Sequence, residues 1–310
     1  MSYSHACVTG GAGFIGSKLV RALLGQGVEV TILDNLSTGR VQNIPLGSRL
    51  IEADILDVQK TEDAIRGCEV VFHLAARVAI RSSFDFIVED TSTNVAGTAS
   101  VLRGAQRSGT VRRVVYTSSM AVYSDSSTPD PIPETHPTRP ISPYGISKLA
   151  GEDLTHSLCR TAGIESVAVR LFNTFGPGQL FSPYVGVVTI FVNKLVRGET
   201  PAIFGDGNQS RDFVHVQDVV AGFLGALTAG VSGETFNIGT GQATTVNQLY
   251  ALVADKMGSR TQANHVAAMP GELRNSVAGI AKAREKLGYW PTYSLHAHLG
   301  AVIDEILQGS

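Results

Sequence analysis

A glycine-rich turn near the N-terminus limits most narrowly what this chain can fold into. The apolar residues 5–9 lead into Gly10-Gly-Ala-Gly-Phe-Ile-Gly16, and apolar side chains then recur at helical spacing over residues 14–24. The predicted order is strand, glycine turn, helix. Glycines allow a tight turn and the close approach of a pyrophosphate, whose charge the free N–H groups at the helix start stabilise. The segment therefore predicts a dinucleotide-binding βαβ unit.

A carboxylate follows at the distance that such a unit requires. Residues 28–33 alternate and are rich in β-branched side chains, as in a strand, and Asp34 ends them 18 residues after Gly16. A carboxylate there can accept hydrogen bonds from both adenosine-ribose hydroxyls and would repel a 2′-phosphate, which favours NAD over NADP. A Walker A loop is excluded because Ser17 follows Gly16 where a lysine is needed. The lesser alternative is that the glycines only pack a helix against a strand.

The alternation of strand and helix continues beyond this first unit. The further strand-like and helical stretches of the first half are residues 49–52, 58–66, 69–73, 94–107 and 111–117. Strands alternating with helices predict an α/β fold with a Rossmann-type, doubly wound parallel sheet.

The second half is organised differently. Residues 124–143 hold six prolines among Asp, Ser and Thr, which predicts a loop. A helix over about 144–161 and a strand over 166–172 follow. Beyond Pro177 the elements become shorter, which predicts a smaller C-terminal α/β lobe for substrate binding. We divide the chain into residues 1–175, the NAD-binding domain, and 176–310, mainly the substrate-binding lobe, from which 214–228 and 235–238 return to the first domain.

Composition excludes several other classes of protein. The 310 residues are 43% hydrophobic and 17% charged, with a formal net charge of -2, which does not suit a nucleic-acid partner or a disordered chain. No apolar run reaches the ~18 residues that span a membrane, and residues 1–6 do not form a signal peptide. Cys7, Cys68 and Cys159 lack a CxxC pair, so neither a metal site nor a disulfide framework is expected. A cytoplasmic protein fits these features best.

A second motif predicts chemistry. Tyr144-Gly-Ile-Ser-Lys148 is YxxxK at the start of a predicted helix, so the phenol and the ammonium share one helix face. A nearby ammonium favours the phenolate, so we expect Lys148 to lower the pKa of Tyr144 and make it a base near neutral pH. Ser118 and Ser119 end a predicted strand, at the edge where ligands bind in such sheets. Ser119 is the candidate to hydrogen-bond a reacting oxygen; capping of the strand end is the plainer role for both serines.

These motifs together resemble the extended short-chain dehydrogenase/reductases over nearly the whole chain. The segments that show the resemblance are Gly10 to Gly16, Asp34, His73-Leu-Ala-Ala76, Ser118-Ser119, Tyr144 with Lys148, and Arg170-Leu-Phe-Asn-Thr-Phe-Gly-Pro177. Within that superfamily, Gly205-Asp-Gly and Arg211-Asp-Phe-Val-His215 are most similar to nucleotide-sugar 4-epimerases of the UDP-glucose 4-epimerase type. The resemblance also implies a homodimer that pairs the helices near 94–107 and 144–161.

The resemblance implies a role for each matching residue. Ser119, Tyr144 and Lys148 would be catalytic. The residues assigned to NAD are Gly10, Gly13, Phe14, Ile15, Gly16, Asp34, Asn35, Asp54, Ile55, Leu74, Ala75, Ala76, Asn94, Tyr144 and Lys148. The residues assigned to a UDP-sugar are Ser118, Ser119, Asn173, Val188, Ala202, Phe204, Arg211, Arg274 and Ser276. Arginine recognises phosphate with a permanent charge and an aromatic ring stacks on a base, which agrees with Arg211 at the diphosphate and Phe204 beside uracil.

The expected reaction is inversion of C4 of a UDP-hexose through a 4-keto sugar. A 4,6-dehydratase of the same superfamily is an alternative, less favoured because such enzymes resemble Thr-Asp-Glu where this chain has Ser119, Met120 and Ala121. A uronate decarboxylase is disfavoured because its pattern also places a glutamate there. A ketoreductase, which exchanges its cofactor, would use the same Tyr144 and Lys148 and stays an alternative. A protein without catalytic activity, which binds NAD for a regulatory purpose, is also an alternative. A serine hydrolase is excluded because the chain has no GxSxG elbow.

The sugar is less well defined by the sequence. Met269 stands where a second phosphate-binding arginine is usual, and Arg274 is the candidate replacement. Ser276 matches the position where a bulky tyrosine closes the pocket to N-acetylated sugars in the family, so UDP-glucose, UDP-galactose, UDP-GlcNAc and UDP-GalNAc are all expected to fit. UDP-glucuronate is an alternative substrate. It is less favoured because the resemblance implies an arginine at this position in some uronate epimerases, and this chain has Leu180 there. The residues do not exclude dTDP or GDP as the nucleotide.

Overall fold

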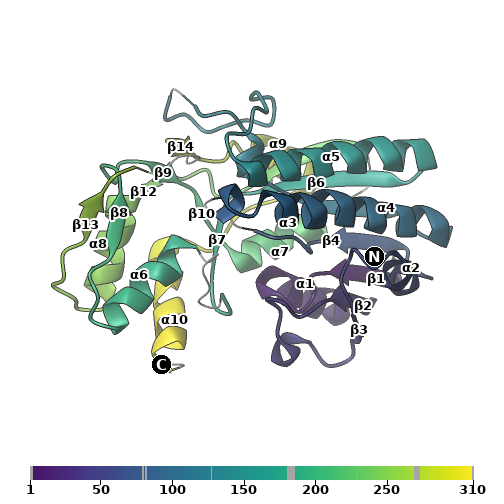
Figure 1. Ribbon diagram of the computed structural model, residues 1–310, viewed down its shortest axis with the longest axis horizontal. Coiled ribbons are helices and arrows are strands. Elements are labelled where there is room, and N and C mark those ends of the chain that lie inside the picture. The colour runs from purple at the N-terminus through teal and green to yellow at the C-terminus, as the bar shows by residue number, and fades with distance from the viewer. Residues whose placement is uncertain are drawn as a thin grey trace.

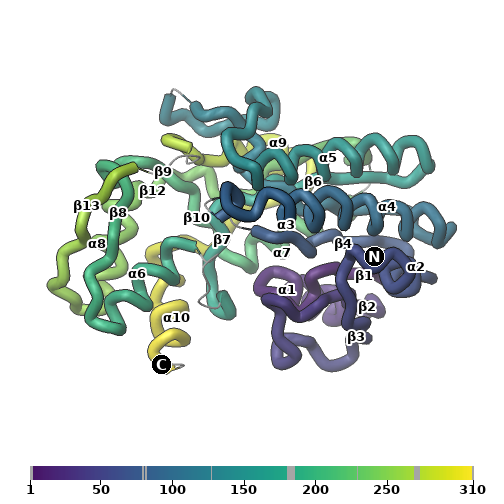
Figure 2. Tube along the Cα trace, in the orientation of Figure 1, coloured from purple at the N-terminus to yellow at the C-terminus, as the bar shows by residue number. Residues whose placement is uncertain are grey.

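The computed structural model describes residues 3–78, 80, 82–126, 128–179, 186–228, 230–268 and 273–308. These residues form two lobes (Figure 1). The larger lobe holds a sheet flanked by helices, and the smaller one gathers α6, α8 and α10 around short strands. The N-terminus lies in the larger lobe and the C-terminal helix in the smaller one (Figure 2).

A seven-stranded sheet forms the centre of the larger lobe. Its strand order is β11-β6-β5-β4-β1-β2-β3, and every pair is parallel. The order reverses at β1, as in a doubly wound fold, so the Rossmann-type prediction is confirmed. The strands are β1 (His5–Thr9), β2 (Glu29–Asp34), β3 (Arg49–Glu52), β4 (Val70–His73), β5 (Arg113–Ser119), β6 (Glu165–Leu171) and β11 (Glu234–Ile238).

Helices cover both faces of this sheet. α1 and α7 pack together on one face, whereas α2, α4 and α5 pack in a row on the other. The helices are α1 (Phe14–Gly25), α2 (Val58–Ile65), α3 (Ile87–Thr91), α4 (Gly97–Ser108), α5 (Pro143–Ala162), α6 (Val187–Val196), α7 (Val216–Gly225), α8 (Val246–Lys256), α9 (Ala281–Leu287) and α10 (Leu295–Gln308). Each face has its own apolar cluster, with Phe72 and Phe223 in one and Leu33 and Val101 in the other.

The sequence explains why the long helix α5 begins where it does. The Ser142 hydroxyl accepts a hydrogen bond from the Gly145 N–H at 3.1 Å, and Pro143 occupies the first helical position. Gly163, with φ of 70°, ends the helix in the left-handed conformation. These caps place Tyr144 and Lys148 in the first two turns. The predicted loop before the helix is irregular and runs past β14 (Asn275–Ser276), where Asn275 Nδ2 donates to the Ser126 carbonyl at 3.2 Å (Figure 1).

The smaller lobe is built from short pairings around a third apolar cluster. Its strands are β7 (Asn173–Phe175), β8 (Ala202–Phe204), β9 (Ser210–Arg211), β10 (Phe213–His215), β12 (Thr244–Thr245), β13 (Asn264–Val266) and β14. β9 pairs with both β12 and β14. Later segments also belong to the larger lobe: β11 pairs with β6, α9 packs on β11, and α7 packs against α1 and β6. No helix in the described ranges is long and apolar enough to cross a membrane.

Candidate active site

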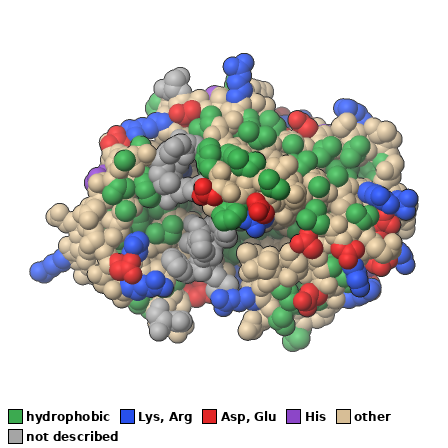
Figure 3. All heavy atoms as spheres, in the orientation of Figure 1, with side chains coloured by type: hydrophobic (Ala, Val, Ile, Leu, Met, Phe, Trp, Pro, Cys, Tyr) green, Lys and Arg blue, Asp and Glu red, His purple; other side chains and the backbone are tan. Residues whose placement is uncertain are grey.

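The residues expected to be functional gather at one edge of the sheet. Because the strands are parallel, their carboxyl ends meet there. Gly10 follows β1, Leu74 follows β4, and Ser119 is the last residue of β5. Viewed as spheres, the molecule is hollowed between the two lobes (Figure 3).

The glycine turn leaves no room for side chains at two of its positions. A Cβ on Gly10, which has φ of +71°, would lie 2.8 Å from the Ala75 nitrogen, and a Cβ on Gly16 would lie 2.1 Å from the Gly10 carbonyl oxygen. Gly13 precedes α1 without a side-chain cap, so the first N–H groups of the helix face no competing side chain. Phe14 and Ile15 form its first turn and are half-buried. This cradle fits a pyrophosphate.

Asp34 is fastened to that turn through both of its carboxylate oxygens. One accepts a hydrogen bond from the Ala12 N–H at 2.9 Å, and the other accepts one from the Leu36 N–H at 2.9 Å. The side chain is almost fully buried. A carboxylate offers about four acceptor positions, so two hydroxyls of a ribose could still be bound. The arrangement fits the adenosine end of NAD.

The residues next to Asp34 have different local roles. Asn35 Nδ2 donates to Asp54 Oδ2 at 2.8 Å, which ties the loop after β2 to the loop after β3. The other oxygen of Asp54 accepts the Leu56 N–H at 2.8 Å. Ile55 is buried against Gly97 of α4, so its side chain does not line the site. Only the backbone of Ile55 could contact a cofactor.

A buried chain of hydrogen bonds supports the loop at residues 74–76. The backbone N–H groups of Leu74 and Ala75 donate to Thr9 Oγ1, which lies 2.7 Å from His73 Nδ1. On the other side, His73 Nε2 lies 2.9 Å from Thr98 Oγ1. Because the Thr98 hydroxyl donates to the Asn94 carbonyl, it accepts from His73, whose proton is therefore on Nε2. Burial lowers the pKa of His73 to about 3, so this imidazole stays neutral.

Asn94 does not face the cofactor edge directly. Its Oδ1 accepts the Arg77 N–H at 2.9 Å, and its Nδ2 donates to the Arg77 carbonyl and to Ser147 Oγ at 2.9 Å. The amide thus fastens the segment after Ala76 to the catalytic helix. Both polar ends of the amide bond protein groups, and the cofactor contact expected of Asn94 stays a prediction. Asn94 lies in a π turn, Ser92–Ala96.

The three residues expected to be catalytic lie together. The Tyr144 hydroxyl lies near Ser119, whose Oγ accepts the Ala121 N–H at 3.2 Å. Lys148 lies one turn further along α5, with Nζ 4.6 Å from the centre of the Tyr116 ring. All three side chains are largely buried. The geometry gives a phenol, a hydroxyl and an amine at the carboxyl end of β5.

Burial governs the protonation of this group. It raises the pKa of Tyr144 to about 12, although the hydrogen bond with Ser119 opposes the shift. It lowers the pKa of Lys148 to about 7, an effect opposed by Glu152. The expectation that Lys148 brings the pKa of Tyr144 near neutrality is therefore wrong for the chain by itself, because burial disfavours the charged form of both groups.

Ser118 points away from Ser119, since neighbouring side chains on a strand face opposite sides of the sheet. Its Oγ donates to Glu152 Oε2 at 2.6 Å, and the serine is 2% exposed. The expected substrate contact of Ser118 is thus corrected to a buried contact with α5. Sequence reasoning missed Glu152, although its spacing of four residues from Lys148 places it on the same helix face as Tyr144 and Lys148.

The substrate side of the site lies around β9. Arg211 is buried and lies opposite Ser276 in the pairing of β9 with β14. Asn173 is joined to the same region by a 3.0 Å hydrogen bond from its N–H to the Asp212 carbonyl. Among the described residues, Asn173 Oδ1, Gln209 Oε1 and Ser276 Oγ are buried without a hydrogen-bond partner. Such acceptors fit the donors of a polar ligand, because an unpaired buried polar atom is otherwise costly.

Three more of the expected substrate residues lie in the smaller lobe. Ala202 and Phe204 are the ends of β8 and are half-buried, and Gln209 Nε2 donates to the Phe204 carbonyl at 2.8 Å. Val188 is buried in the apolar cluster of this lobe, so its side chain packs in the core. The substrate contact expected of Val188 stays a prediction.

Arg274 is engaged by a carboxylate. Its Nη1 and Nη2 donate to Asp206 at 2.7 and 2.8 Å, in the turn after β8. Its backbone N–H donates to Asp125 at 2.7 Å. Arg274 therefore joins two loops at the rim of the lobe, and its contact with a diphosphate stays a prediction. Leu180 and Met269, on which two further predictions depended, lie outside the described residues.

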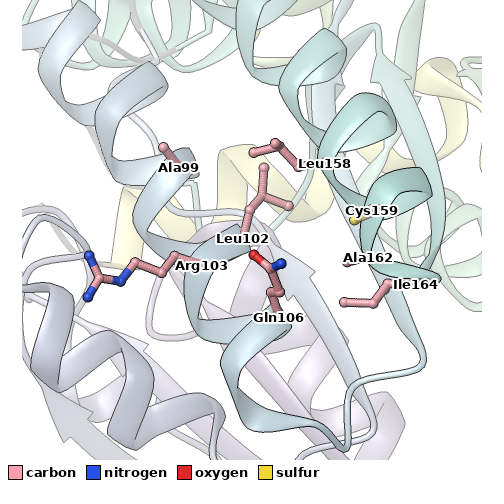
Figure 4. A pocket seen from close by; sticks show the side chains of 8 residues that line it. All are labelled: Ala99, Leu102, Arg103, Gln106, Leu158, Cys159, Ala162 and Ile164. Carbon is pink, nitrogen blue, oxygen red and sulfur yellow. The ribbon is translucent and has the colours of Figure 1, made fainter.

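A shallow pocket lies elsewhere, between α4 and α5 (Figure 4). The residues that line it are Ala99, Leu102, Arg103, Gln106, Leu158, Cys159, Ala162 and Ile164. None of these was expected to be catalytic.

Apolar side chains also gather on the surface over α3 and α5 (Figure 3), among them the exposed Phe86, Ile87 and Ile146.

Comparison with known proteins agrees with this geometry. The sequence profile of the NAD dependent epimerase/dehydratase family matches residues 6–239. The UDP-glucose 4-epimerase of Mycolicibacterium smegmatis is 36% identical over 303 residues, which cover 96% of each chain. The crystal structure of UDP-glucose 4-epimerase from Thermotoga maritima with UDP-glucose superposes with a TM-score of 0.94 at 37% identity, covering 98% of this chain and 99% of that one. MoeE5 in complex with UDP-glucuronic acid and NAD gives a TM-score of 0.90 at 32% identity, covering 99% and 100%. The chain belongs to the NAD dependent epimerase/dehydratase family.

Proposed function

We propose that this chain is an NAD-dependent nucleotide-sugar 4-epimerase, which inverts C4 of a UDP-hexose through a transient 4-keto sugar. The observation that carries the proposal is the convergence of Ser119, Tyr144 and Lys148 at the sheet edge that also holds the glycine turn. UDP-glucose 4-epimerases are among the relatives that match over almost the full chain.

The chain's own residues would bind the cofactor and move one proton. The glycine turn and Asp34 hold the dinucleotide, and Lys148 holds its nicotinamide ribose. When bound, NAD would supply the hydride acceptor and, in its oxidised form, a positive charge that favours a phenolate. Tyr144 then takes the proton from the sugar O4 while Ser119 hydrogen-bonds that oxygen, and Tyr144 returns the proton after the ketone has presented its other face. Configuration changes without net oxidation.

The positions beside Ser119 support epimerisation over elimination. Met120 and Ala121 are both buried and neither side chain can move a proton. A dehydratase has to remove the C6 hydroxyl with an acid and a base, and a decarboxylase of this family has an acidic residue here. A ketoreductase would use the same tyrosine and lysine but would need free NADH in each turnover. Dependence on added cofactor therefore separates these two activities.

The nucleotide would lie along the smaller lobe. We propose that Arg211 binds the diphosphate, that Phe204 stacks beside the base, and that Asn173 hydrogen-bonds the substrate. The buried, unpartnered Oδ1 of Asn173 supports a polar ligand at that position. UDP is the nucleotide named for the similar structures.

The small side chain at position 276 leads us to propose a wide sugar preference. Ser276 is fully buried, and its unpartnered hydroxyl adjoins Arg211 across the strand pair. A serine leaves room that a tyrosine would fill. Both UDP-hexoses and UDP-N-acetylhexosamines are then substrates, and UDP-glucuronate is the third compound to test.

One experiment tests the proposed function. The purified protein is denatured and the released NAD measured, and the intact protein is incubated with UDP-glucose, UDP-GlcNAc and UDP-glucuronate without added cofactor. Formation of the C4 epimer with bound NAD retained is the expected result. Turnover only with stoichiometric NADH would instead indicate a ketoreductase, and NAD binding without any turnover would indicate a regulatory protein.

We also propose that two copies pair through α4 and α5. The apolar pocket between these helices and the exposed Ile146 and Leu158 on α5 support this face, because exposed apolar surface of this kind is typical of protein interfaces. A cytoplasmic location is proposed as well. Cys7, Cys68 and Cys159 are all free thiols, which supports a reducing compartment.

A further inference from the structure

A buried ion pair lies directly beneath the catalytic helix. Arg170 of β6 donates to Glu152 of α5 through Nη2 to Oε1 at 2.5 Å and through Nε to Oε2 at 3.1 Å. Both side chains are less than a tenth exposed. The same carboxylate accepts Ser118 Oγ at 2.6 Å and Thr235 Oγ1 at 3.3 Å. Glu152 therefore joins α5 to three strands, β5, β6 and β11.

The position of Glu152 on the helix brings it close to the catalytic amine. Residues four apart on a helix are neighbours, and their side chains lean toward the helix N-terminus. Glu152 thus lies one helical turn beyond Lys148, as Lys148 lies one turn beyond Tyr144. Burial lowers the pKa of Lys148 to about 7, and Glu152 is the group that opposes this effect.

Several other groups surround Lys148 and also influence its protonation. Tyr116 of β5 lies under the ammonium, with its hydroxyl donating to the Lys148 carbonyl at 3.3 Å. His73 of β4 is neutral, and Asp90 of α3 acts on Tyr144. The charged and titratable groups around this amine are therefore Tyr144, Glu152, Tyr116, His73 and, paired with Glu152, Arg170. Glu152 is the carboxylate on the amine's own helix face.

We propose that Glu152 is a positioning residue of the active site, whose buried carboxylate keeps Lys148 in its ammonium form and fastens α5 to the strand that carries Ser119. Arg170 makes this possible, because a lone buried carboxylate would take up a proton. The hydroxyl of Ser118 serves only the second task. The consequence for catalysis rests on the proposed function, whereas the effect on Lys148 does not.

The test separates charge from attachment with four variants of the full chain. E152Q removes the charge, E152D keeps it, and S118A removes one hydrogen bond but keeps the carboxylate. E152Q leaves Arg170 buried without its partner and could fail to fold, so the double variant E152Q/R170Q, which buries no unpaired charge, is made beside it. The ammonium of Lys148 is titrated by NMR with lysine labelled at Cε, its signal being identified by its loss in K148M.

The titration decides the central point without any enzymatic assay. We expect the midpoint of Lys148 to fall by about one pH unit in E152Q and by a smaller amount in the double variant, which also loses the positive charge of Arg170. In E152D and S118A it is expected to stay within about 0.3 unit of the original. An unchanged midpoint in the folded E152Q or double variant would overturn the proposal. So would an equal fall in S118A, since that serine carries no charge.

Epimerase kinetics then test the consequence. At pH 7, kcat for UDP-glucose is expected to fall about tenfold in E152Q with KM within about twofold, and its decline on the alkaline side is expected to begin at lower pH. A tenfold loss of kcat with an unmoved pH profile would overturn the charge role. If the unaltered chain has no epimerase activity, the proposed function fails, while the titration still tests Glu152.

Discussion

Ala12 and Asp34, 22 residues apart in the sequence, are joined by a 2.9 Å hydrogen bond from the Ala12 backbone N–H to a carboxylate oxygen of Asp34. The bond fastens the end of β2 to the glycine turn after β1. One carboxylate thereby shapes the turn and faces the region expected to hold the adenosine ribose. The choice of cofactor and the shape of the phosphate cradle are therefore connected through a single side chain.

This connection predicts the effect of replacing Asp34. D34N is expected to weaken NAD binding about tenfold and to reduce discrimination against NADP, because the amide no longer repels a 2′-phosphate. Isothermal titration with both dinucleotides measures this. D54N is the matched control, since Asp54 bonds Asn35 and Leu56 but not the glycine turn. Equal NAD affinity in D34N and the original chain would contradict the assignment.

Removing the Tyr144 hydroxyl should abolish the reaction while keeping the fold. In Y144F, kcat is expected to fall by about 10²–10⁴, because no other group at the site is placed to move the O4 proton. Y289F is the control, because Tyr289 is also buried and donates its hydroxyl to the Gly239 carbonyl, away from the catalytic residues. Steady-state kinetics with UDP-glucose test both. Activity in Y144F close to that of Y289F would refute the catalytic role.

Lys148 should make stability depend on pH. Its pKa of about 7 lies below the ordinary 10.5, so between these values the unfolded chain binds the extra proton and stability rises with pH. K148M lacks this term. We expect K148M to be more stable than the original chain by on the order of 1–3 kcal/mol at pH 6, and the difference to shrink as pH rises from about 7 to 10.

Urea unfolding at pH 6, 8 and 9.5 measures this difference, and K148M should have lost its activity. K256M is the control, because Lys256 is the last residue of α8 and its side chain is exposed. If the difference in unfolding free energy between K148M and the original chain stays constant over this pH range, burial does not lower the pKa of Lys148.

The sugar preference should change with the side chain at position 276. S276Y is expected to lower kcat/KM for UDP-GlcNAc at least about tenfold more than that for UDP-glucose, because the ring fills the space proposed for the N-acetyl group. S276A is the control of similar size. Parallel losses for both sugars in S276Y would place the acetamido group elsewhere.

The proposed pairing of two copies can be tested on α5. Ile146 and Leu158 are 57% and 44% exposed, so I146E and L158E should leave the fold intact while placing charge in the proposed interface. Sedimentation equilibrium is expected to change from dimer to monomer in the double variant. R197E, outside α4 and α5, serves as the control. A monomeric original chain would refute the pairing.

Local patterns account for the elements whose place in the fold sequence analysis predicted. The glycine turn, Asp34 and the Tyr144–Lys148 spacing lie within single βαβ or helical segments, where periodicity and turn chemistry determine the geometry. The direction of Ser118 was also available from the two-residue period of a strand, and Glu152 from the four-residue period of a helix. Both roles follow only when the residues that share one face of the strand or helix are taken together.

Other features depend on the tertiary structure. The pairing of Arg274 with Asp206 joins residues 68 apart, and no local pattern relates them. Asn94 bonds Ser147 on a different helix. The pKa of Tyr144 depends on burial by several elements, which outweighs the neighbouring lysine that the motif alone suggests.

The most direct test of the central claim follows the hydrogen at C4. UDP-glucose carrying deuterium at C4 is converted in ordinary water, and the product is examined by NMR. The proposed redox route predicts that UDP-galactose keeps the deuterium at C4 and that single-turnover conversion is slowed by a primary isotope effect. Loss of the deuterium to solvent would contradict it, because the hydrogen would then leave C4 as a proton.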